Sequence, residues 1–129
     1  MKARNARVCI GLEREPAAAS RGRHAVQELL GNDASISFLA DAMLATSELV
    51  TNAVIHTDGP CELTAVYDRQ RALLRVEVAD SSNASPEPRV GLAGVQVGGM
   101  GLRVVEEIAS RWGTYPAVGG KTVWFELEP

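Results

Sequence analysis

The longest helical pattern in the sequence, which runs from residue 36 to about His56, is the feature that most constrains the fold. Ser35 is placed to cap its N-terminus, and the cluster Thr57-Asp58-Gly59-Pro60 stops it. Its apolar side chains recur at the helical period and form one stripe: Leu39, Ala42, Met43, Thr46, Leu49, Val50 and Ala53. Because one apolar stripe needs a covering layer, we expect this helix to pack on a sheet supplied by the rest of the chain.

The remaining patterns supply that sheet and two shorter helices. Apolar segments with β-branched residues or alternation predict strands at 7–13, 61–67, 72–79, 112–117 and 121–127. Helical spacing predicts helices at 17–30 and 101–111. The strands are grouped and do not alternate strictly with helices, so the expected fold class is α+β, a two-layer sandwich with helices on one face of a mixed, mostly antiparallel sheet. The first strand is expected at an edge.

Composition and charge narrow the function classes. The chain has 129 residues, the length of one domain, which we expect to span 1–129. Its formal net charge of -3 argues against direct nucleic-acid binding. Cys9 and Cys61 have no zinc-ligand spacing around them, and a disulfide between them stays open on spacing alone. Without an uninterrupted apolar run of roughly 18 residues, no membrane span is expected, and a cytoplasmic protein fits best.

One face of the long helix carries polar side chains. Glu48, Asn52 and His56 are spaced i, i+4 and i+8, so they stack along the side opposite the apolar stripe. A carboxylate, an amide and an imidazole in a row fit either a solvated face or the wall of a ligand pocket. The residues of the helix leave both interpretations open.

Two further segments have the character of ligand sites. Asp80 directly follows an apolar strand, a position where a polar side chain meets a ligand or simply forms a turn. The sequence Gly98-Gly99-Met100-Gly101-Leu102 opens the predicted helix at 101–111. Glycines let the backbone approach a phosphate closely, and the amides of a helix N-terminus supply donors and partial positive charge.

Two familiar nucleotide motifs are absent. Gly120-Lys121-Thr122 resembles the end of a P-loop, but Tyr115 stands where the first glycine belongs and a strand follows in place of a helix. The stretch Gly99-Met100-Gly101 lacks the third glycine and the preceding strand of a dinucleotide-binding motif.

Taken together, these segments resemble the GHKL ATP-binding superfamily, and within it the small serine-kinase anti-sigma factors of bacteria. The resemblance is carried by Glu48-Leu49-Val50-Thr51-Asn52-Ala53, by Asp80, by Gly99-Met100-Gly101-Leu102 and by the last strand, Gly119 to Leu127. It covers nearly the whole chain and implies the histidine-kinase-like ATPase fold.

The resemblance implies a binding mode for ATP (or ADP) and Mg²⁺. Asn52 would ligate Mg²⁺ through its amide oxygen, and Glu48 would act as the general base or hold a metal-bound water. Asp80 would accept a hydrogen bond from the adenine amino group, supported by Thr122. The phosphates would lie against the backbone at four residues: Gly99, Met100, Gly101 and Leu102. His56 matches a histidine often found in the anti-sigma kinases, although a helix C-terminus also favours histidine.

The segment at approximately 81–99 would be the ATP lid, and Arg89 and Arg103 are candidates for phosphate contact. The sequence departs from the family pattern after Asp80, where Ser82 and Ala84 replace two glycines. The lid also contains no lysine, in contrast to some ATP-hydrolysing relatives. Slow phosphoryl transfer, or binding without catalysis, is compatible with both departures.

The resemblance therefore predicts a protein serine/threonine kinase with two protein partners. It would phosphorylate an anti-sigma factor antagonist and hold a sigma factor inactive. The alternative is a nucleotide-responsive interaction module with little or no kinase activity. An isolated histidine-kinase ATPase domain is disfavoured, because the chain has no dimerisation helix pair. Relatives are often homodimers, and the first strand and helix would form that surface.

Overall fold

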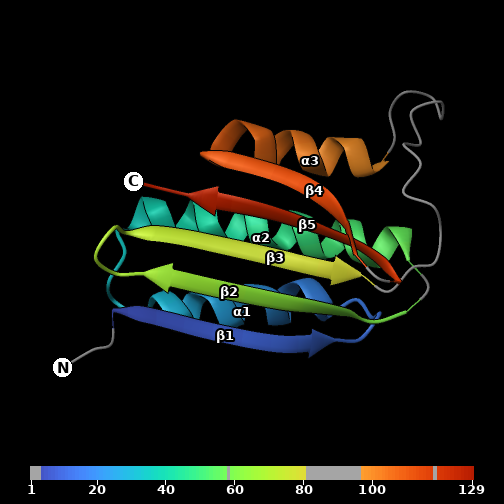
Figure 1. Cartoon of the computed structure of the whole chain (residues 1–129), viewed down its shortest axis with the longest axis horizontal. Coiled ribbons are helices and arrows are strands. Elements are labelled where there is room, and N and C mark those ends of the chain that lie inside the picture. Colours follow the sequence, from blue (N-terminus) through green and yellow to red (C-terminus); the bar gives the residue numbers. More distant parts are fainter. Residues whose placement is uncertain (1–3, 58, 81–96, 118) are drawn as a thin grey trace.

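The computed structural model describes residues 4–57, 59–80, 97–117 and 119–129, with residues 97–101 described as backbone only. In chain order, the elements are β1 (Asn5–Leu12), α1 (Ala18–Leu30), α2 (Ile36–His56), β2 (Cys61–Asp68), β3 (Leu73–Asp80), α3 (Val97–Ile108), β4 (Arg111–Ala117) and β5 (Gly120–Leu127) (Figure 1). The strands and helices expected from the sequence are all present.

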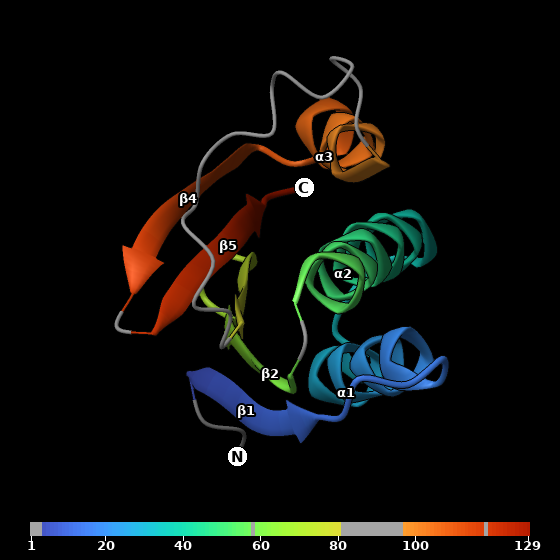
Figure 2. The ribbon, with the colours of Figure 1, turned by 90° about the vertical axis from the view of Figure 1, so that its right-hand side faces the viewer.

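The described strands form one sheet in the order β1-β2-β3-β5-β4. Every pairing in it is antiparallel, so the sheet is more regular than the mixed one that the sequence predicted. The strand β1 lies at an edge, as expected, and β4 forms the other edge. All three helices cover the same face of the sheet (Figure 2). The predicted α+β fold class, with helices on one face, is confirmed.

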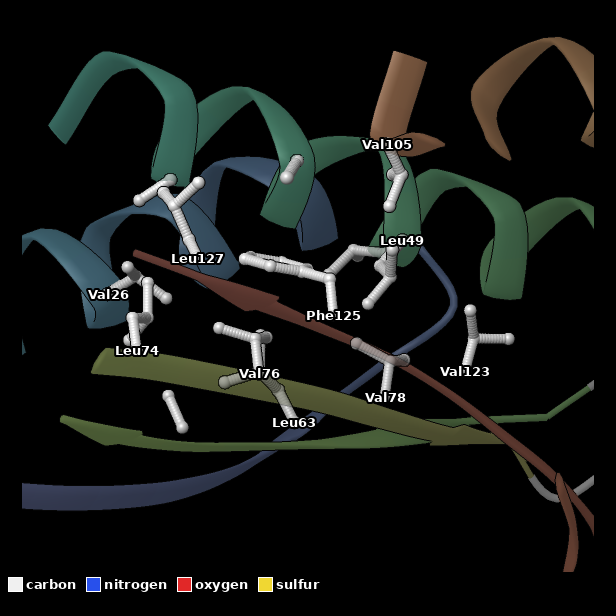
Figure 3. Packing of buried hydrophobic residues seen from close by; sticks show 14 of the residues in the cluster. Val26, Leu49, Leu63, Leu74, Val76, Val78, Val105, Val123, Phe125 and Leu127 are labelled. Atoms are coloured by element: carbon white, nitrogen blue, oxygen red, sulfur yellow. The ribbon is translucent and has the colours of Figure 1, made fainter. Parts of the chain in front are cut away.

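The core lies between α2 and the central strands. The side chains of β3 alternate between buried and partly exposed, and those of β5 from Val123 to its end do the same. Val78, Val123 and Phe125 thus point from the sheet toward the helices, where Leu49 of α2 and Val105 of α3 meet them (Figure 3). Several of these side chains are fully buried, so the sheet positions α2 and α3 through a single apolar cluster.

Local contacts fix the two ends of α2. The hydroxyl of Ser35 accepts a hydrogen bond from the N–H of Phe38 at 3.1 Å, which confirms the predicted N-cap. At the other end, Nε of Arg14 donates to the backbone carbonyls of Val54 (3.2 Å) and Thr57 (2.8 Å). A positive side chain on the last carbonyls satisfies acceptors that the helix leaves without partners and complements its dipole.

The face of the sheet away from the helices is polar and held by ion pairs. Arg75 of β3 donates to Glu126 of β5 at 3.0 Å, and Arg111 of β4 donates to the same carboxylate at 2.7 Å. The guanidinium of Arg75 also lies 4.3 Å from the ring centre of Trp124. The hydrogen bond from Arg111, reinforced by the bond from Arg75, lowers the pKa of Glu126 despite its partial burial. These contacts join β3, β5 and β4 on this face of the sheet.

The largest differences from the predicted boundaries are at the two ends of α3. The helix α3 begins at Val97 and ends at Ile108, whereas the sequence predicted 101–111. It ends early because the N–H of Ser110 donates to the carbonyl of Glu126, which draws the chain into the sheet. It begins early although its first turns contain glycines, each of which disfavours a helix by about 1 kcal/mol. The packing of α3 on α2 compensates for that preference.

By length and composition, the helix α2 could cross a membrane. The sequence predicted no span because α2 contains no uninterrupted apolar run of roughly 18 residues. Length and composition are weak evidence for a span, because a core helix of a globular protein passes the same test. In this fold the apolar stripe of α2 packs against the sheet and against the neighbouring helices α1 and α3.

The hydroxyl of Thr46 on α2 generates a prediction about stability. Thr46 is fully buried, and its Oγ1 has no hydrogen-bond partner within the described residues. Burying a hydroxyl without a partner costs free energy, and valine has the same shape and nearly the same helix propensity. We expect Thr46→Val to raise the free energy of unfolding by about 1 kcal/mol in urea titrations. Thr51→Val, at an exposed position of the same helix, is the control and should change it by less than about 0.5 kcal/mol. A loss of stability in Thr46→Val would contradict this account.

Candidate functional site

Segments that are far apart in the sequence meet at one end of the molecule. The C-terminal half of α2, the end of β3, the start of β5 and the start of α3 all lie at the right-hand end of Figure 1. The antiparallel pairing of β3 with β5 explains this, because the last residue of one strand lies beside the first residues of the other. The fold therefore brings together the three segments that the sequence singled out.

The polar row on α2 contains one side chain that is not solvated. Asn52 is only 6% exposed, whereas Glu48 and His56 are half-buried. No hydrogen bond of the Asn52 side chain is found among the described residues, and Thr46 Oγ1 is the only fully enclosed side-chain polar atom without a partner among them. The Asn52 amide therefore keeps some access to a group from outside the chain. The interpretation of the row as a fully solvated face does not hold for Asn52.

Asp80 ends β3 with its side chain almost completely buried at 2% exposure. Both of its carboxylate oxygens are engaged by Lys121: the backbone N–H donates to Oδ1 at 3.2 Å, and Nζ donates to Oδ2 at 3.0 Å. The preceding residue, Gly120, comes so close that a Cβ there would overlap the Asp80 carbonyl. A buried carboxylate paired with an ammonium group has its oxygens oriented by that partner.

The alternation of β5 decides which side chains share a face with Asp80. Val78 of β3 pairs with Val123, and Ala79 pairs with Thr122. Because paired residues point to the same face and neighbours point to opposite faces, Lys121 lies on the helix-covered face with Asp80, while Thr122 lies on the other face with Ala79. The Thr122 side chain thus lies on the face of the sheet opposite to Asp80, and it is buried there.

Lys121, the partner of Asp80, is not among the candidate site residues that the sequence indicated. In the sequence it stands in a false P-loop and in the last strand of the family resemblance. Val123, Phe125 and Leu127 alternate with polar or aromatic residues, and this pattern indicates that the side chain at position 121 lies on the same face of the strand as these apolar residues. The partnership with Asp80, however, depends on strand register, and no local pattern encodes a register between segments so far apart.

Cys61 extends the same row across the sheet. It begins β2, pairs with Asp80 in the register, and is buried on the helix-covered face. Burial, with a smaller contribution from the negative charge of Asp80, raises the pKa of the Cys61 thiol to about 11. Both cysteines are free, and Cys9 is exposed. The row Cys61, Asp80 and Lys121 therefore crosses three adjacent strands at the end of the sheet.

The glycine-rich segment forms the beginning of α3 and does not precede it. With the helix starting at Val97, the first four backbone N–H groups, which lack partners inside a helix, include those of Gly99 and Met100. The N–H groups of Gly101 and Leu102 fall within the helix, contrary to the expectation that the helix would start at Gly101. Leu102 packs partly buried against the core.

Of the two candidate arginines, one lies within the described residues. Arg103 is exposed on α3. Arg89, Ser82, Ala84 and most of the expected lid lie outside the described residues. Among the described residues, no group of three or more His, Cys, Asp or Glu side chains is placed to hold a metal ion.

Comparison with known proteins assigns the architecture. The family model for the histidine kinase-like ATPase domain matches residues 12–127. Among solved structures, the chain is similar to the crystal structure of the RsbU and RsbW domains of Rv1364c from Mycobacterium tuberculosis, with a TM-score of 0.71 and 24% identity over 95% of this chain and 32% of that chain. A search of the curated proteins found no match.

A second solved structure has a weaker similarity. The histidine kinase domain of the blue-light activated histidine kinase EL346 from Erythrobacter litoralis matches with a TM-score of 0.52 and 19% identity, over 87% of this chain and 59% of that chain. This chain therefore spans less than two thirds of either structure. At these identities the similarity shows a shared fold.

The different surroundings of the two thiols generate a prediction. Maleimide reacts with the thiolate, so the exposed Cys9 should be modified at neutral pH while Cys61, buried and with its pKa raised to about 11, should not. We expect mass spectrometry to find one adduct per folded chain and two in denaturant. In Cys9→Ser, the folded protein should show none. Rapid modification of Cys61 in the folded Cys9→Ser variant would show that this end of the sheet opens readily.

Proposed function

This chain belongs to the histidine kinase-like ATPase domain family, and on that premise we propose that it is an ATP- and Mg²⁺-dependent regulatory protein of the anti-sigma-factor type. The proposed activity is transfer of phosphate from ATP to a serine or threonine of an anti-sigma factor antagonist. The proposed regulatory role is to hold a sigma factor inactive. The observation that carries the proposal is that Asn52 on the C-terminal half of α2 and Asp80 at the end of β3 are both buried, on elements that lie at the same end of this family's fold.

Asp80 is the proposed recognition group for the base. A carboxylate is an acceptor only, so it can accept a hydrogen bond from the amino group of adenine. Its burial makes that bond stronger than it would be in water. Thr122, whose side chain lies on the opposite face of the sheet, would influence this contact only through the backbone or the strand geometry.

Asn52 is the proposed protein ligand for Mg²⁺. Its amide oxygen is the kind of hard donor that Mg²⁺ accepts, and its nearly buried position on α2 fits that use. Because the described residues contain no cluster of acidic ligands, the remaining ligands would be nucleotide phosphates and water. Bound Mg²⁺ would neutralise charge on the phosphates.

Glu48 is the proposed general base. It lies one helical turn before Asn52, on the same face of α2. Its carboxylate would take the proton of the substrate hydroxyl as that oxygen attacks the terminal phosphorus of ATP; the bond to the bridging oxygen breaks and ADP leaves. Half-burial keeps the carboxylate accessible to a hydroxyl from another protein.

The start of α3 would bind the phosphates. The proposal uses the backbone of Gly99, Met100, Gly101 and Leu102, of which the first two have N–H groups without partners inside the helix. His56, at the C-terminus of α2, would lie at the margin of the nucleotide site. We further infer that residues 1–129 act as one ATP-binding domain in the cytoplasm, with 81–99 as its lid, and that two copies can associate.

The alternative function is a nucleotide-responsive interaction module with little or no kinase activity. Ser82 and Ala84, together with a lid that lacks lysine, favour it. Both functions require the same nucleotide site, and they differ only in whether Glu48 is needed.

Nucleotide binding tests the site itself. We expect Asp80→Asn to weaken Mg-ATP binding at least about tenfold in calorimetry, because an amide in place of the carboxylate loses the charged acceptor. Glu62→Gln is the matched control, since Glu62 is an exposed acid on the outer face of β2, beside Ala79. It should leave the affinity unchanged. Unaltered affinity in a folded Asp80→Asn protein would refute the assignment of the base site.

Phosphoryl transfer separates the two functions. Incubation with labelled ATP, Mg²⁺ and a candidate antagonist should label that protein, and Glu48→Gln should reduce the rate by about 100-fold or more while retaining ATP binding. Asp41→Asn, on the first half of the same helix, is the control and should transfer at the normal rate. If Glu48→Gln retains full control of the partner in cells, the non-catalytic alternative is correct.

A further inference from the structure

The ion pair between Lys121 and Asp80 is the strongest feature that the proposed function leaves unexplained. Lys121 contacts both carboxylate oxygens, one through its backbone and one through its side chain. An ordinary surface ion pair leaves both partners solvated, but here the Asp80 side chain is 2% exposed and that of Lys121 only 25%. A nucleotide base that reaches Asp80 must therefore also meet the ammonium group.

We infer that Lys121 is a base-recognition residue that donates a hydrogen bond to N1 of adenine beside the Asp80 contact. The inference rests on the proposed function, because it assumes that Asp80 accepts a bond from the adenine amino group. It adds a specificity-determining side chain that forms part of the protein's direct contact with the base.

The donor and acceptor chemistry supports this role. An ammonium group has three N–H donors and no acceptor, and only one of those donors is used on Oδ2 of Asp80. The Nζ atom lies 3.0 Å from that oxygen, so the pair presents a donor and an acceptor side by side. The edge of adenine presents the complementary pair, because the N1 acceptor adjoins the carbon that bears the amino donor. One side chain of each kind can thus engage both atoms at once.

Position and rigidity support it as well. Lys121 lies on the helix-covered face with Asp80, at the end of the sheet where α2 ends and α3 begins. Its backbone is held in β5 by pairing with β4 and by its own N–H bond to Asp80. The side chain of Lys121 is 25% exposed, so it is partly accessible at this end of the sheet. A donor held in this way loses little freedom on binding a base.

The experiment compares two ligands on two proteins by calorimetry. The ligands are ADP and 1-deaza-ADP, in which a C–H group replaces the N1 acceptor. We expect the wild-type protein to bind ADP at least about tenfold more tightly than 1-deaza-ADP, the size of a hydrogen bond from a charged donor. In Lys121→Met the ratio should fall to within about twofold of one, because the donor is gone.

Control variants distinguish loss of base recognition in Lys121→Met from a general loss of positive charge and from a loss of folding. Arg71→Met removes a positive charge from an exposed position in the turn between β2 and β3, at the opposite end of the sheet. It should retain the full ratio. Lys121→Met leaves the buried Asp80 without its cation, so its melting temperature is measured in parallel. If it does not fold, Lys121→Gln keeps an N–H donor for Asp80 without the charge and should show a ratio below that of the wild type.

Each outcome bears on the inference. Equal binding of both ligands by the wild type overturns it, and so does an unchanged ratio in a folded Lys121 variant. If Lys121→Met binds both ligands more tightly at an unchanged ratio, the ion pair is an inhibitory contact and the inference is wrong. If the wild type binds neither ADP nor ATP, the proposed function itself fails. Binding of ADP with no preference over 1-deaza-ADP removes only the role of Lys121.

Discussion

Burial of α2 against the sheet is the interaction on which the rest of the structure depends. Within its apolar stripe, Leu49 and Val50 are fully buried between the central strands and the neighbouring helices. Once this stripe faces the sheet, the helical period fixes where the other side of α2 points, and that side carries Glu48, Asn52 and His56. The polar row is thereby oriented by apolar packing, and none of its members needs a specific contact with the sheet.

The same packing creates a low-dielectric border around the polar groups at the end of the sheet. Asp80 and Cys61 are paired in the strand register, and both are buried at the end of the apolar core. The raised pKa of Cys61 reports this environment, since burial disfavours the thiolate and the nearby carboxylate adds to the effect. A charge there requires a partner, and Lys121 supplies it within the protein. For a base-recognition site, this means that the carboxylate oxygens are oriented before any ligand arrives.

The mild acidity of the chain is compatible with a polyphosphate ligand. Binding of this kind would rely on backbone amides at a helix start and on a metal held by an amide oxygen, so it needs no basic patch. The helix α3 is positioned for this through Val105, which joins the core beside Leu49 and Phe125. Its glycines stand at the beginning of the helix and not before it, because packing on α2 outweighs their poor helix propensity.

The sequence by itself determined the elements, the fold class and most of the candidate site residues. Hydrophobic periodicity and capping residues are local, so the stripe of α2, the Ser35 cap and the two hairpins were readable from the chain. Only the tertiary structure decided the strand order, the antiparallel pairing of β3 with β5 and the side of the sheet on which each β5 residue lies relative to Asp80. A shift of one residue reverses the face of every side chain in a strand, so only the register decides that Lys121, and not Thr122, shares a face with Asp80. Register follows from how two distant segments bury their apolar faces together, and that information is not present in either segment alone.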